Sequence, residues 1–502
     1  MPLPRLLFLG AALVASVSVR AQSLTPCRDG QADGYPCHRI DLGANVGLDV
    51  FEANRGNDIW GWTDAETDRE YALVGLSDGT AFVDVTEPTE PVYLGKLPTA
   101  TVLSGWRDIK TYGHHAFVVS EAPGHGMQVF DLTRLRDVPG PPQTFTADAH
   151  YVGAGKAHNL VINEDTGFAY IVGANEAGFP CNAGGLHIVD VRVPLTPTFA
   201  GCFDGDGYTH DAQCVVYDGP DADYTGREIC MAANEDNVAI VDVTDKANPS
   251  LVAHAVYLNA AYTHQGWLTD DRRFFLVDDE LDESMGLTSH TRTLVFDVSD
   301  LDAPEFVQHL AGHSAATDHN LYVRGRYAFL SNYQAGLRVV DLSAIESGVL
   351  TEVAAFDTYP EADAPAFNGQ WSNYPFFPSG TIVANDIERG LFVLVPQFPI
   401  VPDDDTPDPD VPAGARFALS EAAPNPAPGP SALRLVVTDN QHVEAAAYDV
   451  AGRRVATLFR GTARAGVPLR LTLERSGLAA GLYLVRVTGE HFSATRRVSL
   501  VH

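Results

Sequence analysis

The feature that most constrains the fold is a short apolar strand that ends on an aspartate and recurs along the chain. "GTAFVDVTEP", "GLHIVDVRVP" and "NVAIVDVTDK" are three of its copies. The aspartates follow one another at intervals of 44 to 59 residues, at Asp84, Asp131, Asp190, Asp242, Asp297 and Asp341. A seventh copy, "GLFVLVPQFP", has Leu394 at the equivalent place. A period of about 50 residues made of short strands and turns is typical of a β-propeller blade.

Each copy has the same order of four strands. A first strand with polar residues at its start ("THDAQCVVYDG") precedes an aromatic or β-branched strand ("EICMAANE"), then the aspartate strand, then a strand that follows proline ("PSLVAHAVY"). Seven such copies predict a seven-bladed β-propeller over residues 22–400. The last copy has no fourth strand of its own. The N-terminal run "YPCHRIDLGANVGL" is predicted to supply it and to close the ring.

The recurring aspartate is interpreted as architecture rather than as chemistry. Six copies distributed around a ring lie too far apart to form one active site. An aspartate followed two residues later by Thr or Ser, as in "DVT" and "DLS", can accept backbone N–H groups in the turn that leaves the strand. The sequence therefore predicts a turn cap at these positions.

A candidate site lies where the first strands of the repeats begin. Histidines recur there, at His158, His210, His264 and His319, and Asp108 takes the equivalent place in an earlier copy. An acid recurs at the end of the second strand, at Glu121, Glu176, Glu235 and Glu280. Because the first and second strands are antiparallel neighbours, we expect both rows to face the same mouth of the central channel.

Three interpretations of these rows remain open. The paired side chains could form a hydrogen-bonded girdle between the inner strands. They could bind a polar ligand or a divalent metal of the calcium or zinc class, with His210, His264, Glu235 and Glu280 as metal ligands. They could also act as general acid and base. The chain contains no GxSxG, HExxH, P-loop or Rossmann motif, so no catalytic residue is assigned.

The two ends of the chain differ from the repeats. Residues 1–21 combine one Arg, an apolar run and a small-residue cleavage site, which is typical of a secretory signal peptide. No later run is long and apolar enough for a transmembrane segment in the mature chain. Residues 401–414 form an acidic, proline-rich linker. The alternating runs in residues 415–502 predict a small β-sandwich of immunoglobulin type.

Charge and cysteine content indicate the compartment. The chain has 33 Lys and Arg against 65 Asp and Glu, a net charge of −32, which disfavours nucleic acid as a partner. Six cysteines follow the signal peptide, and an exported chain favours disulfides. Six cysteines allow fifteen pairings. Proximity along the chain favours Cys27–Cys37, Cys181–Cys202 and Cys214–Cys230.

Two family resemblances follow from these motifs. The repeats "GLHIVDV", "VAIVDV" and "GLRVVDL" resemble the LVIVD repeat of exported bacterial propellers. Residues 25–398, with "CRDGQADGYPC", "THDAQC" and "THQGW", resemble the choice-of-anchor B family. In the tail, "YDVAGRRVATL" and "GLAAGLYLVRVTG" resemble the type A sorting domain of the type IX secretion system.

The resemblances imply a secreted protein, located on the outer cell surface or released, with the type IX secretion machinery as the partner of its C-terminal domain. They carry over no catalytic residue. We therefore expect a binding or scaffold propeller with an unidentified extracellular ligand, a carbohydrate or a protein. The alternative is a secreted metal-dependent hydrolase or lyase that uses the histidine and acid rows.

Overall fold

The computed structural model is almost entirely β-structure. It describes residues 24–400, 415–420, 422, 425, 427, 431–450, 452–463, 469–473, 475 and 478–501. The predicted signal peptide (1–21) and linker (401–414) lie outside the described residues. The described part contains no α-helix, only the short 3-10 helices η1 (Leu132–Leu135) and η2 (Ile345–Ser347). Neither could cross a membrane.

Residues 24–400 form seven sheets, each with at least four strands. The first three contain β4 (Gly56–Asp64), β5 (Arg69–Leu76), β6 (Gly79–Asp84) and β7 (Val92–Pro98); β8 (Arg107–Tyr112), β9 (His115–Ser120), β10 (Met127–Asp131) and β12 (Ala149–Tyr151); and β13 (Asn159–Asn163), β14 (Phe168–Val172), β15 (Leu186–Asp190) and β16 (Thr198–Phe203). The next three contain β17 (Asp211–Val216), β18 (Glu228–Ala233), β19 (Val238–Asp242) and β20 (Ser250–Ala255); β21 (Thr263–Leu268), β22 (Phe274–Asp279), β23 (Arg292–Asp297) and β24 (Glu305–Ala311); and β25 (Leu321–Arg324), β26 (Tyr327–Ser331), β27 (Leu337–Asp341) and β28 (Thr351–Phe356).

The seventh sheet joins the two ends of this region. It contains β29 (Gln370–Tyr374), β30 (Ile382–Asp386), β31 (Gly390–Pro396) and β3 (Ile40–Val46). The N-terminal strand β3 pairs antiparallel with β31, more than 300 residues away in sequence, and Leu42 lies opposite Leu394. Two shorter additions extend other sheets: β11 (Gln143–Thr144) along β7, and the hairpin of β1 (Gln31–Ala32) and β2 (Tyr35–His38) along β28.

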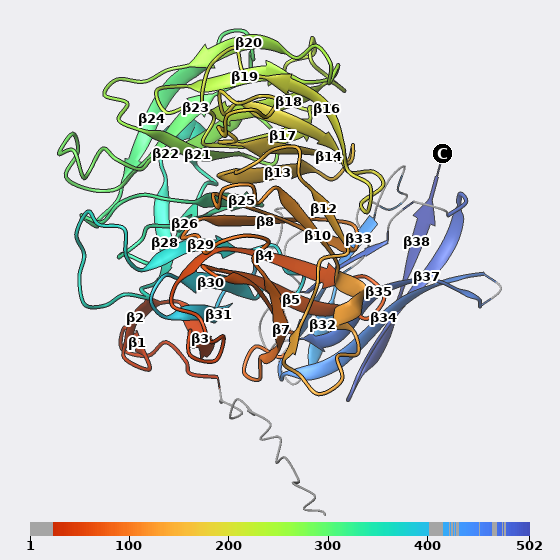
Figure 1. Ribbon diagram of the computed structural model, residues 1–502. Coiled ribbons are helices and arrows are strands. Elements are labelled where there is room, and N and C mark those ends of the chain that lie inside the picture. Colours follow the sequence, from red (N-terminus) through yellow and green to blue (C-terminus); the bar gives the residue numbers. More distant parts are fainter. Residues whose placement is uncertain are drawn as a thin grey trace, which may run out of the picture.

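The sheets follow one another around a common centre, which is a propeller-type arrangement. Their first strands contact one another in the order β4, β8, β13, β17, β21, β25 and β29, and β29 contacts β4 again. Figure 1 shows the chain running from the orange strands through green and cyan, until β31 lies beside the red β3. The start of every first strand therefore lies near the start of its neighbours.

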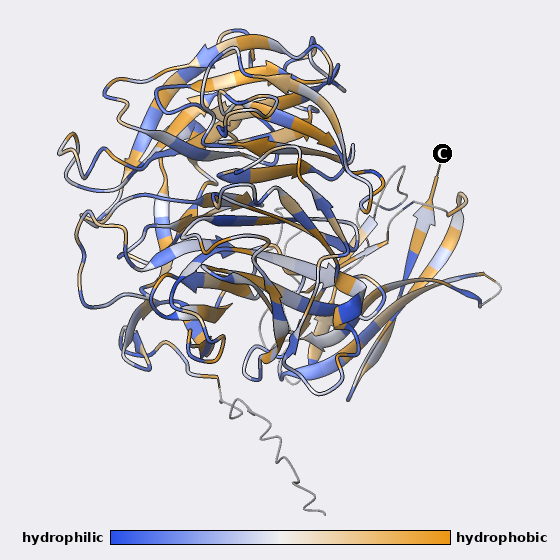
Figure 2. Ribbon diagram, in the orientation of Figure 1, coloured by the Kyte–Doolittle hydropathy of each residue, from blue (hydrophilic) through white to orange (hydrophobic). Residues whose placement is uncertain are grey.

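The core lies between adjacent sheets. Every residue of β18, β19 and β22 is buried, and the middle strands carry long hydrophobic segments (Figure 2). Ile188 and Val241, for example, belong to one apolar cluster that joins the third and fourth sheets. Because both faces of a middle strand pack against other sheets, its sequence reads as a nearly continuous apolar run, as in "EICMAA".

The predicted turn caps are confirmed at all six recurring aspartates. In each copy the backbone N–H two residues later donates to the aspartate, at 2.8 to 3.0 Å, as shown by Asp84, Asp131, Asp190, Asp242, Asp297 and Asp341.

The recurring aspartate has a second partner that was not predicted from the sequence. An arginine at the start of the second strand pairs with the aspartate in four copies: Arg69–Asp84, Arg227–Asp242, Arg273–Asp297 and Arg326–Asp341.

The predicted disulfides are confirmed as bonds Cys27–Cys37, Cys181–Cys202 and Cys214–Cys230. The first closes the N-terminal hairpin, and the third joins directly opposed residues of β17 and β18. Such bonds are typical of an oxidising compartment, so they are consistent with an extracellular protein.

The C-terminal region forms two antiparallel sheets over one apolar core. One sheet contains β32 (Phe417–Leu419), β33 (Ser431–Val437) and β36 (Leu469–Leu473); the other contains β34 (Gln441–Asp449), β35 (Arg454–Ala463), β37 (Gly481–Gly489) and β38 (Ser493–Leu500). Leu435 and Leu471 from one sheet and Val485 from the other are completely buried in that core.

Candidate metal centre

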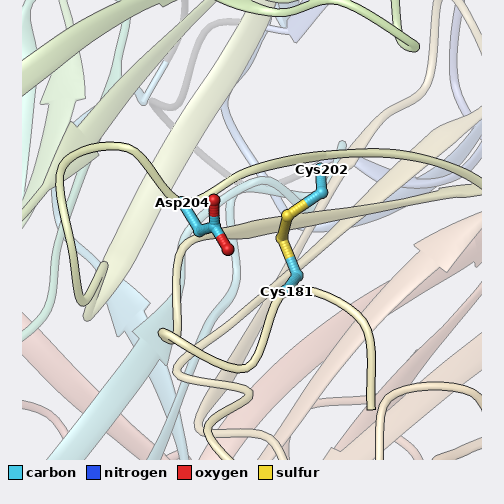
Figure 3. Close-up of side chains that lie close together, drawn as sticks. All are labelled: Cys181, Cys202 and Asp204. Carbon is cyan, nitrogen blue, oxygen red and sulfur yellow. A yellow bond between two sulfur atoms is a disulfide. The ribbon is translucent and has the colours of Figure 1, made fainter.

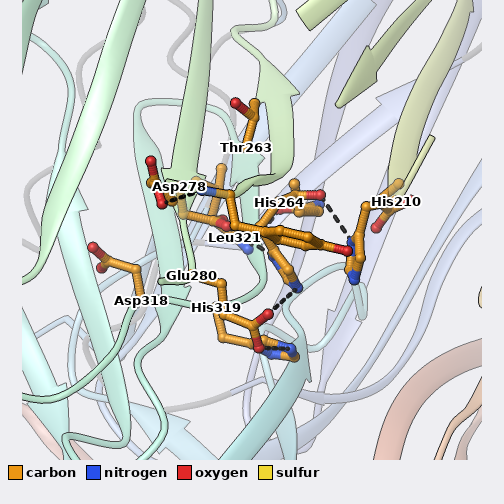
Figure 4. Close-up of polar contacts among 12 residues, drawn as sticks. His210, Thr263, His264, Asp278, Glu280, Asp318, His319 and Leu321 are labelled. Atoms are coloured by element: carbon orange, nitrogen blue, oxygen red, sulfur yellow. Dashed lines mark hydrogen bonds and ion pairs between the residues drawn. The ribbon is translucent and has the colours of Figure 1, made fainter. Parts of the chain in front are cut away.

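Four histidines from four consecutive sheets lie side by side at the starts of the inner strands. His158 precedes β13, His210 precedes β17, His264 is the second residue of β21, and His319 lies just before β25. Successive ring centroids are 4.2, 4.1 and 4.5 Å apart along this series. The arc arises because the inner strands are neighbours and each contributes a histidine at nearly the same level. Figure 4 shows three of these rings around Glu280.

The Nδ1 atom of each ring is held by a hydrogen bond. In His158 and His264 the partner is a carboxylate, Glu121 at 2.6 Å and Asp278 at 2.8 Å. In His210 and His319 the partner is a backbone carbonyl oxygen of the next sheet, from His264 (3.0 Å) and from Trp371. Carbonyl oxygens only accept, so Nδ1 of His210 and of His319 carries the proton, and Nε2 of a neutral ring keeps its lone pair.

Burial keeps the inner rings neutral. His210, His264 and His319 are exposed by 4%, 1% and 3% of their surface. Loss of solvent, reinforced by the neighbouring histidines, lowers the pKa of His210 and His264 well below the usual value. Burial also lowers the pKa of His319 to about 3. The neutral imidazole is the form that binds metal ions.

Glu280 completes the cluster. Its Oε2 lies 4.0 Å from Nε2 of His264, and its Oε1 lies 3.7 Å from Nε2 of His319. The hydroxyl of Tyr333 donates to Oε1 at 2.7 Å, and burial raises the pKa of Glu280 to about 7. One ligand atom each from His210, His264 and Glu280 lie within 4.8 Å of one another. Two imidazole nitrogens and a carboxylate oxygen are a ligand set that suits zinc.

The arrangement of second partners also resembles that of metal sites. A metal-binding histidine usually donates its other ring N–H to a carboxylate or a carbonyl, which fixes the orientation of the ring. His210, His264 and His319 all have such a partner on Nδ1. The distances from Glu280 to Nε2 of His264 and His319 are too long for hydrogen bonds. The geometry therefore accommodates a cation between these groups.

The structure brings together most of the sequence-predicted residues. His210, His264, His319 and Glu280 form the central cluster. The pair His158–Glu121 lies next to it, because the His158 ring contacts that of His210, with the two ring planes tilted by 56°. This pair is more open to solvent, with side-chain exposures of 12% for His158 and 30% for Glu121.

Asp108 does not join the histidines. It is the second residue of β8, and its side chain contacts other groups. Its carboxylate accepts from Lys110 Nζ and from the backbone N–H of Leu160, both at 2.5 Å. Lys110 also lies 3.7 Å from Asp58, and these three residues form a separate polar group along the inner strands, in which both acids are buried and the Lys110 side chain is 12% exposed.

Two of the predicted acids also lie apart from the central cluster. Glu176 accepts from the backbone N–H of Gly124 at 2.9 Å. Glu235 adopts a left-handed backbone conformation (φ 64°) in an exposed turn after β18, and its backbone pairs with Thr263. The ligand atoms that converge come from His210, His264 and Glu280. Glu235 is therefore not among the three residues whose ligand atoms converge.

Three contributors to the cluster were not evident from the sequence. Asp278 precedes Glu280 in "VDDE" and was hidden among neighbouring acids. Tyr333 lies in the turn after β26, and only the fold brings its hydroxyl to Glu280. The Trp371 carbonyl belongs to the backbone, so no side-chain pattern could have indicated it.

A second group with metal-like spacing has a different explanation. Cys181, Cys202 and Asp204 lie close together, but the two sulfurs form a disulfide (Figure 3). Metal binding by cysteine requires the thiolate. This group is therefore a structural bridge between the loop before β15 and the end of β16.

Comparison with known proteins adds the repeat family. A family model for the LVIVD repeat matches residues 318–357, which contain β25 to β28 and the cap Asp341. This confirms the repeat predicted from the sequence in that copy. No curated protein sequence matches the chain.

Several solved structures are similar at low identity. A protein from Lactobacillus plantarum is 13% identical, with 84% of this chain and 99% of that chain covered and a TM-score of 0.41. The Cps50 (Swd1) β-propeller domain of Myceliophteria thermophila is 11% identical, with coverages of 72% and 99% and a TM-score of 0.44. The periplasmic gluconolactonase PpgL of Pseudomonas aeruginosa is 14% identical, with coverages of 60% and 88% and a TM-score of 0.41.

Proposed function

We propose that this chain is an exported binding protein, built on a seven-bladed propeller of LVIVD repeats, that holds a divalent metal ion of the zinc class at the mouth of its central channel. The ligands are His210, His264 and Glu280, and His319 is the fourth ligand or a hydrogen-bond partner of Glu280. One observation carries this proposal. Three buried imidazoles are oriented through Nδ1, and the Nε2 atoms of two of them approach one carboxylate.

The main competitor for this arrangement is a purely structural girdle. A girdle would satisfy both nitrogens of each ring by hydrogen bonds. Within residues 24–400, the acid nearest to Nε2 of His264 and His319 is Glu280, at 4.0 and 3.7 Å. A cation between them would bind these lone pairs and would also stabilise an ionised Glu280, whose burial otherwise favours the neutral form.

The proposed route to the exterior uses both ends of the chain. The N-terminal 21 residues would direct export, and residues 415–502 would be recognised by the type IX secretion machinery. Disulfides in the propeller support the extracellular destination. The resemblance to the choice-of-anchor B family further supports attachment to the outer cell surface, or release from it.

In this function the metal and its surroundings recognise an extracellular ligand, a carbohydrate or a protein. Open coordination positions on zinc bind oxygen or nitrogen donors of a ligand. The half-exposed Glu121 and the exposed Glu235 lie on the rim of the same mouth and could contact the remainder of that ligand.

A metal-dependent hydrolase or lyase is the second candidate, and the His158–Glu121 pair favours it. The pair is hydrogen-bonded at 2.6 Å, is partly open to solvent, and lies against the ring of His210. A histidine oriented by a carboxylate next to a metal ion could take a proton from a metal-activated nucleophile.

Metal analysis of the purified full-length chain tests the proposal. After loading with ZnCl₂ and dialysis, we expect one zinc per chain by elemental analysis. The double variant His210→Ala/His264→Ala should lose the zinc and keep the circular dichroism spectrum of the wild type. His254→Ala, at an exposed histidine on β20, is the matched control and should keep the zinc. A wild-type chain that retains no zinc would contradict the proposal.

Glu121→Gln separates the two candidates. This change removes the acid that orients His158, but leaves the three ligands in place. If the chain is a binding protein, zinc content and ligand binding in a screen of carbohydrates and peptides should survive the change. If it is a hydrolase or lyase, turnover of a substrate found in the same screen should fall by about 10²-fold or more.

A further inference from the structure

The loop between β22 and β23 contributes to a second cluster, built only from carboxylates. Asp282 and Glu283 come from this loop, and Asp318 comes from the segment before β25. Their exposed fractions are 0%, 5% and 2%, and one oxygen of each lies within 4.8 Å of the others. Figure 4 shows Asp318 on the far side of Glu280 from His210, so this cluster is distinct from the histidines.

Among the described residues, the one cation in contact with this cluster is Arg292, which the cluster shares with Asp279. Nε of Arg292 lies 2.5 Å from Asp282 Oδ2, and the same guanidinium lies 3.8 Å from Asp279. Asp318 accepts the backbone N–H of Arg292, at 2.5 Å. Asp279 and Asp282 share this guanidinium, and among the described residues Glu283 and Asp318 have no cation within ion-pair distance, so the ionised carboxylates would leave an excess of negative charge in a region from which solvent is excluded.

Glu283 gives an independent indication of a missing partner. Both of its carboxylate oxygens are buried, and neither has a hydrogen-bond donor in the described structure. Oδ1 of Asp282 is also buried and has no hydrogen-bond donor in the described structure. Buried polar groups are almost always satisfied, and an unpaired buried carboxylate is strongly unfavourable. Within the described residues, no N–H or hydroxyl donor reaches these oxygens, so they point to a cation or to protons shared with Asp282 and Asp318.

We propose that Asp282, Glu283 and Asp318 bind a calcium ion. Three carboxylates offer up to six oxygen ligands, and calcium takes six to eight oxygens in flexible geometry. The absence of nitrogen and sulfur donors among these three residues disfavours zinc, which distinguishes this site from the histidine cluster. The ion would neutralise the excess charge and would supply the partner that Glu283 lacks.

Calcium at this place would also order the mouth of the channel. Asp282 follows Glu280 by two residues, and Asp318 immediately precedes His319. The ion would therefore clamp the loop after β22 to the segment before β25. This holds in place two side chains of the histidine cluster that come from different sheets, whichever ligand that cluster binds.

Protons are the chemical alternative to calcium. Burial and nearby acids raise the pKa of Glu283 to about 11, and burial raises that of Asp318 to about 7. Carboxylic acids could then share hydrogen bonds with carboxylates in the cluster. Calcium dependence and the behaviour of a neutral isostere distinguish the two states.

Calcium binding by the full-length chain provides the test. After removal of metal with EGTA, we expect one Ca²⁺ per chain in equilibrium dialysis at about 1 mM CaCl₂, the range of extracellular calcium modules. The Tm should rise by a few degrees in CaCl₂ compared with EGTA. Glu283→Gln should weaken calcium binding at least tenfold and abolish the rise in Tm.

The acids Asp221, Asp300 and Asp302 have similar spacing, with Asp300 and Asp302 exposed and Asp221 partly buried, and give the matched control. Asp300→Asn should bind calcium as the wild type does. A wild type without bound calcium, or Glu283→Gln with wild-type affinity, would overturn the proposal. A Tm that rises equally in MgCl₂ would also overturn it, because that result indicates charge screening rather than a site. So would a Glu283→Gln variant that is more stable than a calcium-insensitive wild type, which is the signature of the protonated cluster.

Discussion

The Nδ1 atom of His264 lies 2.8 Å from a carboxylate oxygen of Asp278, and both residues are almost completely buried. This contact orients the ring so that Nε2 faces Glu280. Burial, and then the negative charge of Asp318, raise the pKa of Asp278 well above its usual value. A metal ion on Nε2 would provide the opposite charge that favours an ionised Asp278 and an Nδ1 proton on His264.

Asp278→Asn should therefore weaken zinc binding without removing a ligand. We expect a loss of about 10- to 100-fold in affinity, the usual effect of removing a partner behind a metal-bound histidine. Competition with a chromophoric chelator measures this affinity directly. Glu176→Gln changes an acid of the same rim that contacts Gly124 rather than a histidine, and should leave the affinity unchanged. Equal affinities for Asp278→Asn and the wild type would indicate that His264 is not a ligand.

The candidate site was only partly predictable from the sequence. The row of histidines could be found because the repeat places them at equivalent positions, and repetition is visible in one sequence. The sequence could not show which of the acids join the histidines, because a turn decides whether an acid points inward. Glu280 ends up beside His319, whereas Glu235 sits in an exposed left-handed turn. The carbonyl partner of His319 has no side-chain signature at all.

Removal of a recurring turn cap should destabilise the propeller modestly. Asp242 accepts the N–H of Thr244 at 2.9 Å and pairs with Arg227 at 2.6 Å. Asp242→Ala is expected to lower the free energy of unfolding by about 1–2 kcal/mol, because the turn loses its cap and Arg227 loses its ion-pair partner. Urea unfolding measures the difference. Asp218→Ala, which removes an exposed acid near Arg272, should change it by less than about 0.5 kcal/mol.

The seventh sheet forms without this aspartate cap, so we expect the energetic contribution of the cap in the other sheets to be local. Leu394 stands where the aspartate would be and is completely buried opposite Leu42 of the N-terminal strand. Here apolar packing against β3 replaces the cap. An Asp242→Ala cost above about 4 kcal/mol would show that the cap is more than local, because costs of that size come from disrupted cores or networks.

Strand order was predictable for a related reason. Short apolar strands separated by turn residues, repeated with one period, leave few topologies, and distant pairing of β3 with β31 follows from a missing fourth strand. Additions without a repeat were not foreseen: β11 joins the first sheet although it follows β10 in sequence. The arginine at the start of the second strand was also overlooked, although "REYALVG" and "REICMAA" both display it.

The three disulfides should differ in their resistance to reduction. Cys214 and Cys230 are exposed by 5% and 0% and join two strands within one sheet, whereas Cys27 and Cys202 are only half-buried. A reductant must reach the sulfur, so dithiothreitol should open the bonds of Cys27 and Cys202 first. Alkylation followed by peptide mass spectrometry gives the order. If the Cys214–Cys230 bond were reduced first under native conditions, the fourth sheet would have to open more readily than its burial indicates.

A buried histidine outside the candidate site predicts acid sensitivity. His125 has no exposed surface; its Nε2 lies 3.1 Å from Arg107 Nη1, and its Nδ1 lies 3.0 Å from the carbonyl oxygen of Gly126. The guanidinium only donates and the carbonyl only accepts, so the ring is neutral with its proton on Nδ1. Burial, and then the charge of Arg107, lower the pKa of His125 to about 4.

This pKa lies below the value of about 6.5 that a histidine has in the unfolded chain. The unfolded state therefore binds the proton first as the pH falls, so the stabilisation is present above about pH 6.5 and is lost as the pH approaches 4. This shift of the His125 pKa corresponds to about 3 kcal/mol of unfolding free energy.

His125→Gln stays neutral, so the difference in unfolding free energy between the wild type and this variant should fall by that amount between about pH 7.5 and pH 4. His150, whose ring faces His125, and Gln128 are the other polar groups there, and His150→Gln controls for the former. Parallel pH profiles for the wild type and His125→Gln would mean that the His125 ring is already doubly protonated and positively charged in the folded chain, and that Arg107 has moved away from it.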